Sequence, residues 1–219
     1  MGILHKGKQG GNMIPKRLIY AWFGNSEKPS LIQKCIESWG KILPEYEIIE
    51  LNENTCDISK YKYAQKAYEQ KKWAFVADCM KIAYLYEYGG IVIDADVESL
   101  KPFPEEMLTH EAFTSCESSG KLISAVIAAK PKNIWINKIL KYYKQHDFEF
   151  NPQKITNTVI IDNINKKWYQ KTVGDIIYLH GNVAVYPADV LEAKEWFSGK
   201  TNITERTVCL HHYEGSWVK

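Results

Sequence analysis

Two aspartates separated by one small residue close an apolar segment, Gly-Gly-Ile-Val-Ile-Asp-Ala-Asp, at residues 89–96. Side chains alternate between the faces of a strand, so Asp94 and Asp96 would share one face and Ala95 would lie on the other. Two adjacent carboxylates repel each other unless a cation lies between them, and oxygen ligands suit Mg²⁺ or Mn²⁺. The pattern predicts a metal site that could hold a diphosphate. The simpler alternative is a solvated acidic turn after a core strand.

The segments before the aspartates alternate between strand-like and helix-like patterns. This order implies a parallel sheet with right-handed crossovers, in which ligands bind beyond the carboxyl ends of the strands. Trp22 and Phe23 lie at the end of the first strand as the aspartates lie at the end of the third, so we expect all four at one edge. The predicted strands are 17–23, 46–51 and 91–95, and the predicted helices are 29–44 and 61–88, the latter as one helix or two.

The second half of the chain is less regular, but it has no composition break and no linker. We therefore expect one α/β domain over residues 14–219, with a mostly parallel central sheet flanked by helices, after a flexible leader at residues 1–13. The predicted strands of this half are 112–115, 123–128, 176–179, 183–186 and 207–211, and its predicted helices are 133–146 and 156–168.

Composition and charge are those of an ordinary globular protein: 45% of the 219 residues are hydrophobic, 25% are charged and the net charge is +2. Lys and Arg are scattered, which argues against a nucleic-acid partner. The five cysteines form no Cys-x-x-Cys or Cys/His pattern, so we expect neither zinc nor disulfides, and a reducing compartment. The sequence has no apolar run of membrane-spanning length and no signal-peptide core, so we expect a cytoplasmic protein.

Further short motifs run through the chain in a fixed order. They are 20–24 (Tyr-Ala-Trp-Phe-Gly), 35–39 (Cys-Ile-Glu-Ser-Trp), 73–78 (Trp-Ala-Phe-Val-Ala-Asp), 84–90 (Tyr-Leu-Tyr-Glu-Tyr-Gly-Gly) and 211–217 (His-His-Tyr-Glu-Gly-Ser-Trp). With the aspartate pair, they resemble the DxD-containing glycosyltransferases of family 32, a group that includes yeast-type mannosyltransferases and bacterial capsular polysaccharide transferases. The resemblance implies a GT-A fold and retaining transfer of a sugar from a nucleotide donor with a divalent metal, Mn²⁺ or Mg²⁺.

The same resemblance implies which residues hold the metal. Asp94 and Asp96 match the DxD motif, in which the second carboxylate binds the metal and the first contacts donor hydroxyls, sometimes through water on the metal. His211 is implied as a third metal ligand. His212 is the fallback, because only one of two adjacent side chains on an extended segment can face the site. The metal set is therefore Asp94, Asp96 and His211.

The resemblance also implies the donor contacts. Trp22 would stack on the nucleobase, although a core tryptophan fits the same pattern. Asp78 stands in an apolar helical stretch and would hold hydroxyls of the donor sugar. It is counted with Asp94 and Asp96 as catalytic. Lys81 stands where relatives usually carry Arg, so it is either a donor contact or a surface lysine. The remaining implied donor contacts are Ala21, Phe23, Ser216 and Trp217.

The sequence favours a glycosyltransferase that uses a nucleotide-sugar donor, UDP before GDP, and a glycan or lipid-carrier-linked acceptor. The expected setting is bacterial surface polysaccharide synthesis at the cytoplasmic face of the membrane, with possible peripheral association. A haloacid-dehalogenase-like phosphatase with Asp94 as nucleophile and a non-catalytic nucleotide-sugar-binding module are the alternatives. A nucleotidyltransferase is less well supported, because no Gly-rich phosphate loop is present. No residue can be named as the nucleophile of a retaining reaction.

Overall fold

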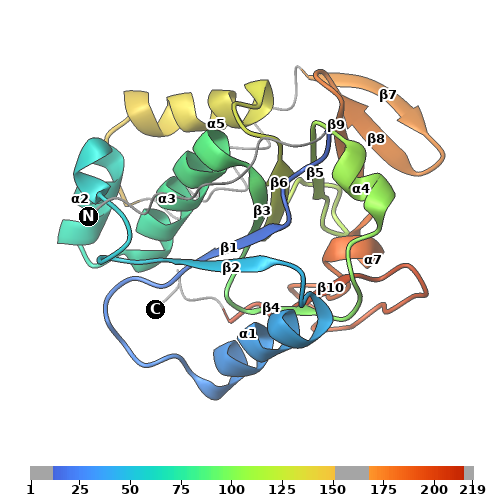
Figure 1. The fold of residues 1–219 in the computed structure, drawn as a ribbon, viewed down its shortest axis with the longest axis horizontal. Coiled ribbons are helices and arrows are strands. Elements are labelled where there is room, and N and C mark those ends of the chain that lie inside the picture. Colours follow the sequence, from blue (N-terminus) through green and yellow to red (C-terminus); the bar gives the residue numbers. More distant parts are fainter. Residues whose placement is uncertain (1–11, 151–167, 215–219) are drawn as a thin grey trace.

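The elements of the first hundred residues form in the predicted order (Figure 1). The structure is a computed structural model, and it describes residues 12–150 and 168–214. The predicted helical stretch at 61–88 is two helices, and the predicted helix at 156–168 lies almost wholly outside the described residues. The elements are β1 (Arg17–Ala21), α1 (Ser30–Ile42), β2 (Glu47–Leu51), the 3₁₀ turn η1 (Ile58–Lys60), α2 (Lys62–Glu69), α3 (Trp73–Tyr88) and β3 (Gly90–Ile93).

An eight-stranded sheet forms the centre of the molecule, in the order β2-β1-β3-β6-β5-β9-β8-β7. Pairing is parallel between β1 and both β2 and β3, and between β5 and β9. Only β6 and β8 run against the other strands of this sheet, so the predicted mostly parallel sheet is confirmed. The strands of the second half are β5 (Ala112–Ser115), β6 (Val126–Ala129), β7 (Tyr169–Val173), β8 (Ile176–Leu179) and β9 (Val183–Tyr186).

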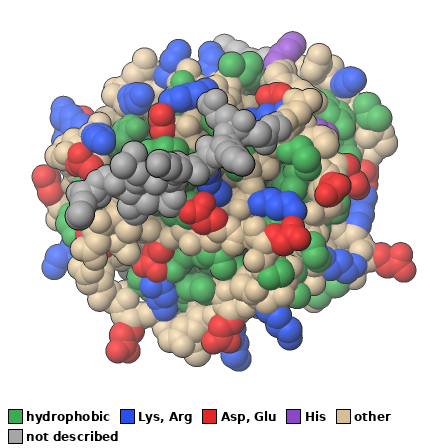
Figure 2. All heavy atoms as spheres, viewed as in Figure 1, with side chains coloured by type: hydrophobic (Ala, Val, Ile, Leu, Met, Phe, Trp, Pro, Cys, Tyr) green, Lys and Arg blue, Asp and Glu red, His purple; other side chains and the backbone are tan. Residues whose placement is uncertain are grey.

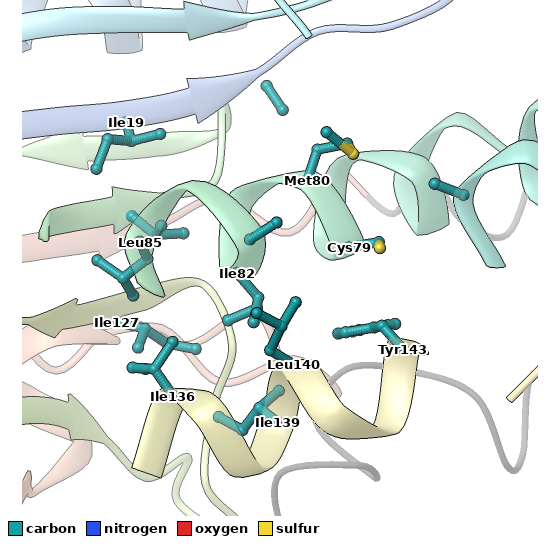
Figure 3. Packing of buried hydrophobic residues seen from close by; sticks show 14 of the residues in the cluster. Ile19, Cys79, Met80, Ile82, Leu85, Ile127, Ile136, Ile139, Leu140 and Tyr143 are labelled. Atoms are coloured by element: carbon teal, nitrogen blue, oxygen red, sulfur yellow. The ribbon is translucent and has the colours of Figure 1, made fainter. Parts of the chain in front are cut away.

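Alternating side chains divide the core between the two faces of the sheet. On β1, Ile19 packs toward α2, α3 and α5 (Ile134–Gln145), whereas Leu18 packs toward α1, α4 (Glu105–Thr109) and α7 (Ala188–Leu191). Figure 3 shows the first of these layers, in which Ile82 and Leu85 of α3 lie between the sheet and the Ile136 side of α5. The predicted α/β layers are thus present on both faces.

A short antiparallel ribbon lies outside the main sheet, and it brings the end of the chain beside the aspartates. Strand β4 (Val97–Ser99) pairs with β10 (Cys209–His211), so that His211 lies opposite Val97. Helix α1 holds this ribbon: Trp39 Nε1 donates to the Val97 carbonyl at 2.8 Å, and Ser38 Oγ accepts from the Ser99 amide at 3.0 Å. The 35–39 motif therefore has a structural role in supporting β4.

The third strand ends earlier than predicted, and this changes the reason why the aspartates converge. β3 ends at Ile93, and the residues from Asp94 to Val97 form a turn in which the Val97 amide donates to the Asp94 carbonyl at 3.0 Å. Alternation of side chains along a strand was therefore the wrong explanation for why the Asp94 and Asp96 carboxylates lie close together. Gly90 allows β3 to begin beside β1, because a Cβ atom there would lie 2.9 Å from the Arg17 carbonyl oxygen.

Charged side chains of both signs are interspersed over the face of the molecule in Figure 2. All five cysteines are free thiols in the structure. Among the described residues, every helix is too short or too polar to cross a lipid bilayer.

Candidate metal and donor site

Three side chains from two segments distant in sequence meet beyond the end of β3. A ligand atom from each of Asp94, Asp96 and His211 lies within 4.8 Å of the others, and all three residues are half-buried. The aspartates come from the turn between β3 and β4, and His211 comes from β10, which pairs with β4. The ribbon thus places the three residues that the sequence assigned to a metal in one cluster.

The imidazole of His211 lies between two carboxylates. Its Nε2 is 3.3 Å from Asp96 Oδ1, and its Nδ1 is 2.9 Å from Glu192 Oε1. Burial alone would lower the pKa of His211, but the Glu192 and Asp96 carboxylates raise it to about 10. Burial opposes ionisation of Asp96, yet its hydrogen bond with His211 holds the pKa of Asp96 at about 2. The two carboxylates therefore favour the protonated form of His211.

His212, the fallback ligand, lies on the other side of the extended segment. Its Nε2 is 2.9 Å from Glu98 Oε2, and its backbone amide donates to the Asp96 carbonyl at 3.0 Å. The Glu214 amide donates to Asp96 Oδ2 at 2.8 Å. These contacts fasten the chain after β10 to the aspartate turn and direct His211 toward Asp96.

Glu192 is a site residue that the sequence did not predict. It is almost fully buried after α7, accepts hydrogen bonds from His211 Nδ1 and the Tyr213 hydroxyl, and its Oε2 has no partner among the described residues. A carboxylate partner for the second nitrogen of an imidazole fixes the tautomer and raises the basicity of a metal ligand. The only sequence signal was an acidic residue within the apolar run 190–193.

Lys81 is buried, so the surface alternative for this lysine is wrong. Its Nζ contacts Asp94 Oδ1 and lies 3.2 Å from Asp78 Oδ1. The contact with Asp94 joins α3 to the DxD turn. Burial alone would lower the pKa of Lys81, but Asp94 and Asp78 raise it. Burial also raises the pKa of Asp78 to about 6, against the effect of Lys81. The three predicted residues form one charged group beside the metal cluster.

The predicted base-stacking segment follows β1, next to β3 in the sheet. Trp22 is half-buried, its Nε1 donates to the Ser26 carbonyl at 2.8 Å, and Lys28 Nζ lies 5.9 Å from the centre of its ring. The side chains of Ala21 and Phe23 are buried in the core, so these residues can offer a ligand mainly their backbone. Ser216 and Trp217 lie outside the described residues.

The donor set of the cluster fits a divalent cation. Two carboxylates and one imidazole suit Mn²⁺, and carboxylates with water suit Mg²⁺. If a cation replaced the proton on Nε2 of His211, Glu192 would hold the remaining proton on Nδ1 and leave the Nε2 lone pair to bind the cation. The Glu214 amide holds the Asp96 carboxylate, and the His212 amide holds the Asp96 backbone carbonyl.

Comparison with known proteins agrees with this geometry. Residues 29–114 match the family model described as "Glycosyltransferase sugar-binding region containing DXD motif", which confirms the predicted resemblance to DxD-containing glycosyltransferases. Comparison with curated protein sequences gives no match.

Two solved structures show the fold. The "PaToxG Glycosyltransferase" aligns with a TM-score of 0.55 at 19% identity, over 69% of this chain and 68% of its own. A glycosyltransferase "involved in the glycosylation of the major capsid of PBCV-1" aligns with a TM-score of 0.51 at 11% identity, over 92% of this chain and 96% of its own. The predicted GT-A-like fold is confirmed.

Proposed function

We propose that this chain is a retaining glycosyltransferase that moves a sugar from a nucleotide-sugar donor, with UDP favoured, to a hydroxyl of a glycan or lipid-carrier-linked acceptor. In this reaction the bond between the anomeric carbon and the diphosphate breaks, a bond to the acceptor oxygen forms, and the acceptor proton is released. The observation that carries the proposal is the meeting of Asp94, Asp96 and His211 beyond β3. The match of residues 29–114 to a sugar-binding region supports it.

Asp94, Asp96 and His211 would hold Mn²⁺ or Mg²⁺. A divalent cation bound there neutralises the negative charge that develops on the departing diphosphate. Asp96 is the main ligand in this proposal, because two backbone-anchored contacts already fix its position. Asp94 would share its carboxylate between the ion and the donor hydroxyls.

The remaining donor contacts follow from position. Trp22 lies at the same sheet edge and would stack on the nucleobase, beside the backbone of Ala21 and Phe23. Asp78 and Lys81 lie behind Asp94 and would orient hydroxyls of the donor sugar. Ser216 and Trp217 are assigned to the diphosphate by resemblance alone.

The fold favours this function over a haloacid-dehalogenase-like phosphatase, because both solved structures described above are glycosyltransferases. The proposed setting is bacterial surface polysaccharide synthesis at the cytoplasmic face of the membrane, which follows from the sequence resemblance.

Donor hydrolysis tests the proposal. Wild-type protein with Mn²⁺ is expected to release nucleotide from one member of a panel of UDP- and GDP-hexoses, and chelation should stop the release. Asp96→Asn should lower the rate by roughly a hundredfold or more. Glu69→Gln, which neutralises an exposed carboxylate at the end of α2, is the matched control. Equal release by wild type and Asp96→Asn, or no release from any donor, would contradict the proposal.

A further inference from the structure

The loop between α7 and β10 presents two adjacent aromatic side chains to solvent. Phe197 is 97% exposed and Trp196 is 38% exposed. Single exposed apolar residues are common, but an adjacent aromatic pair on one loop is a feature of binding surfaces. The question is what holds this pair in place and what it faces.

Hydrogen bonds hold the loop in one shape. The Glu195 amide donates to the Lys200 carbonyl and the Gly199 amide donates to the Glu195 carbonyl, each at 2.9 Å. Ser198 Oγ donates to Glu195 Oε2 at 2.7 Å and accepts from the Lys200 amide at 3.1 Å. An antiparallel bridge between Lys194 and Thr201 closes the base of the loop. The backbone that carries the aromatic pair is therefore pre-organised, which lowers the entropic cost of binding.

Two ring contacts connect this loop to the metal cluster. The Trp196 ring packs edge-on against Tyr213 with 5.2 Å between centroids, and the Tyr213 ring lies over His211 at 3.9 Å. Lys194 Nζ donates to the His212 carbonyl at 2.9 Å, and Glu192 at the start of the loop contacts His211. Trp196 is thus fixed beside the reaction centre of the proposed function, and Phe197 follows it on the same loop.

The charges on this loop favour an uncharged ligand. Lys194 donates a hydrogen bond to the His212 carbonyl, and Arg206 forms ion pairs with Asp175 and Asp189. Two exposed charges flank the pair on the loop, Glu195 and Lys200, and they have opposite signs. An anionic lipid surface selects for an excess of basic residues, which this loop lacks. A neutral sugar fits better, since its CH groups can pack on a ring face while its hydroxyls bond to a carboxylate or an ammonium group.

We propose that Trp196 and Phe197, supported by Tyr213, form the acceptor platform of the enzyme and bind a neutral pyranose ring of the acceptor. This inference rests on the proposed function, because it places the acceptor hydroxyl next to the metal cluster. It adds a substrate class, a neutral glycan, and two residues that recognise it through their aromatic faces.

Saturation-transfer NMR with the methyl α- and β-pyranosides of glucose, galactose and mannose tests the platform without requiring turnover. Ring protons of at least one glycoside should receive saturation from wild-type protein, and the effect should fall about threefold or more in Phe197→Ala and Trp196→Ala. Ile203→Ala, which removes an exposed aliphatic side chain from the same connection, should match wild type. In the transfer assay, Phe197→Ala should raise the KM for the glycoside about tenfold.

The outcomes separate the two proposals. Donor hydrolysis without saturation of any glycoside, or equal saturation in wild type and Phe197→Ala, overturns the platform and leaves the transferase intact. If a glycoside receives saturation from wild type but not from Phe197→Ala, and wild type hydrolyses no donor, sugar binding at the platform is supported and the transferase proposal is overturned. Vesicle sedimentation tests the lipid alternative. If wild type sediments with phosphatidylcholine vesicles, with or without phosphatidylglycerol, and Phe197→Ala does not, the aromatic pair is a membrane contact and the platform proposal is overturned. Phe197→Ala removes a side chain in open solvent, so misfolding is not an explanation for its effect.

Discussion

Glu192 Oε1 accepts a hydrogen bond from Nδ1 of His211 at 2.9 Å, on the side of the imidazole away from Asp96. The carboxylate is almost fully buried, and its second oxygen has no partner among the described residues. Burial of a carboxylate is costly unless a partner compensates it, and the imidazole is that partner here, so Glu192 is placed to orient the ring. Glu192 is therefore expected to tune the metal affinity of the site without touching the metal.

Glu192→Ala is expected to weaken Mn²⁺ binding by about 10- to 100-fold, because His211 loses the partner that fixes its tautomer. Free Mn²⁺ measured by electron paramagnetic resonance during titration gives the affinity directly. Glu192→Gln can still accept from Nδ1 and should lose less. Glu205→Ala, an exposed glutamate of the same connection, is the control. An unchanged Mn²⁺ affinity in Glu192→Ala would show that the carboxylate has only a packing role.

Lys81→Met is expected to destabilise the metal-free protein yet increase its response to Mn²⁺. The substitution leaves Asp78 and Asp94 without their shared cation, at a cost toward the lower end of about 3–5 kcal/mol because both carboxylates are partly exposed. It also frees Asp94 for a metal, so Mn²⁺ should raise the Tm of the variant more than that of wild type. Urea unfolding and thermal melting measure the two effects.

Lys81→Arg keeps the charge and serves as the matched variant. It should retain most of the stability in the absence of metal, and its Mn²⁺ response should remain near that of wild type. If Lys81→Met were as stable as wild type, or if Mn²⁺ stabilised both equally, the idea that Lys81 and Mn²⁺ compete for the Asp94 carboxylate would be wrong.

The parts of the fold that depend on local pattern were predictable. Helical spacing and Gly89-Gly90 located α3 and β3, because both signals lie within one segment. Spacing alone also placed Asp94 and Asp96 together, although the reason was a turn rather than a strand. The motif at 20–24 contains Gly24, where a Cβ atom would lie 2.7 Å from the Trp73 ring, so a close approach explains the glycine.

The parts that depend on contacts between distant segments were not predictable from pattern. The pairing of β4 with β10 joins Val97 to His211, and no local periodicity encodes such a register. Glu192 carried no motif, since only its position against His211 makes it part of the site. The burial of Lys81 likewise follows from packing of α3 against the DxD turn, and a lysine in sequence gives no sign of it.

Trp39→Phe is expected to loosen the ribbon that carries the site. The substitution keeps most of the aromatic volume but removes the N–H that donates to the Val97 carbonyl, leaving a buried acceptor unpaired at a cost of about 1–3 kcal/mol. Hydrogen exchange of the β4 and β10 amides should accelerate, and Mn²⁺ affinity should fall because His211 is held through this ribbon. Glu37→Ala on the exposed side of α1 is the control. Unchanged exchange in β10 would contradict the supporting role of α1.

Arg206 joins two segments of the second half, and this link should make stability depend on acid pH. Arg206 pairs with Asp189 in α7 and with Asp175 in the β7–β8 turn, and its hydrogen bonds lower the pKa of Asp189. A carboxylate whose pKa is lower in the folded state stabilises the protein above its unfolded value of about 3.9, and this stabilisation is lost as pH falls through the folded value. Arg206→Ala should therefore reduce the free energy of unfolding at pH 7 and flatten its decline below about pH 4. Asp189→Asn added to Arg206→Ala should change the pH dependence of the free energy of unfolding little further. If wild type and Arg206→Ala show the same pH dependence, Asp189 does not contribute to the acid sensitivity.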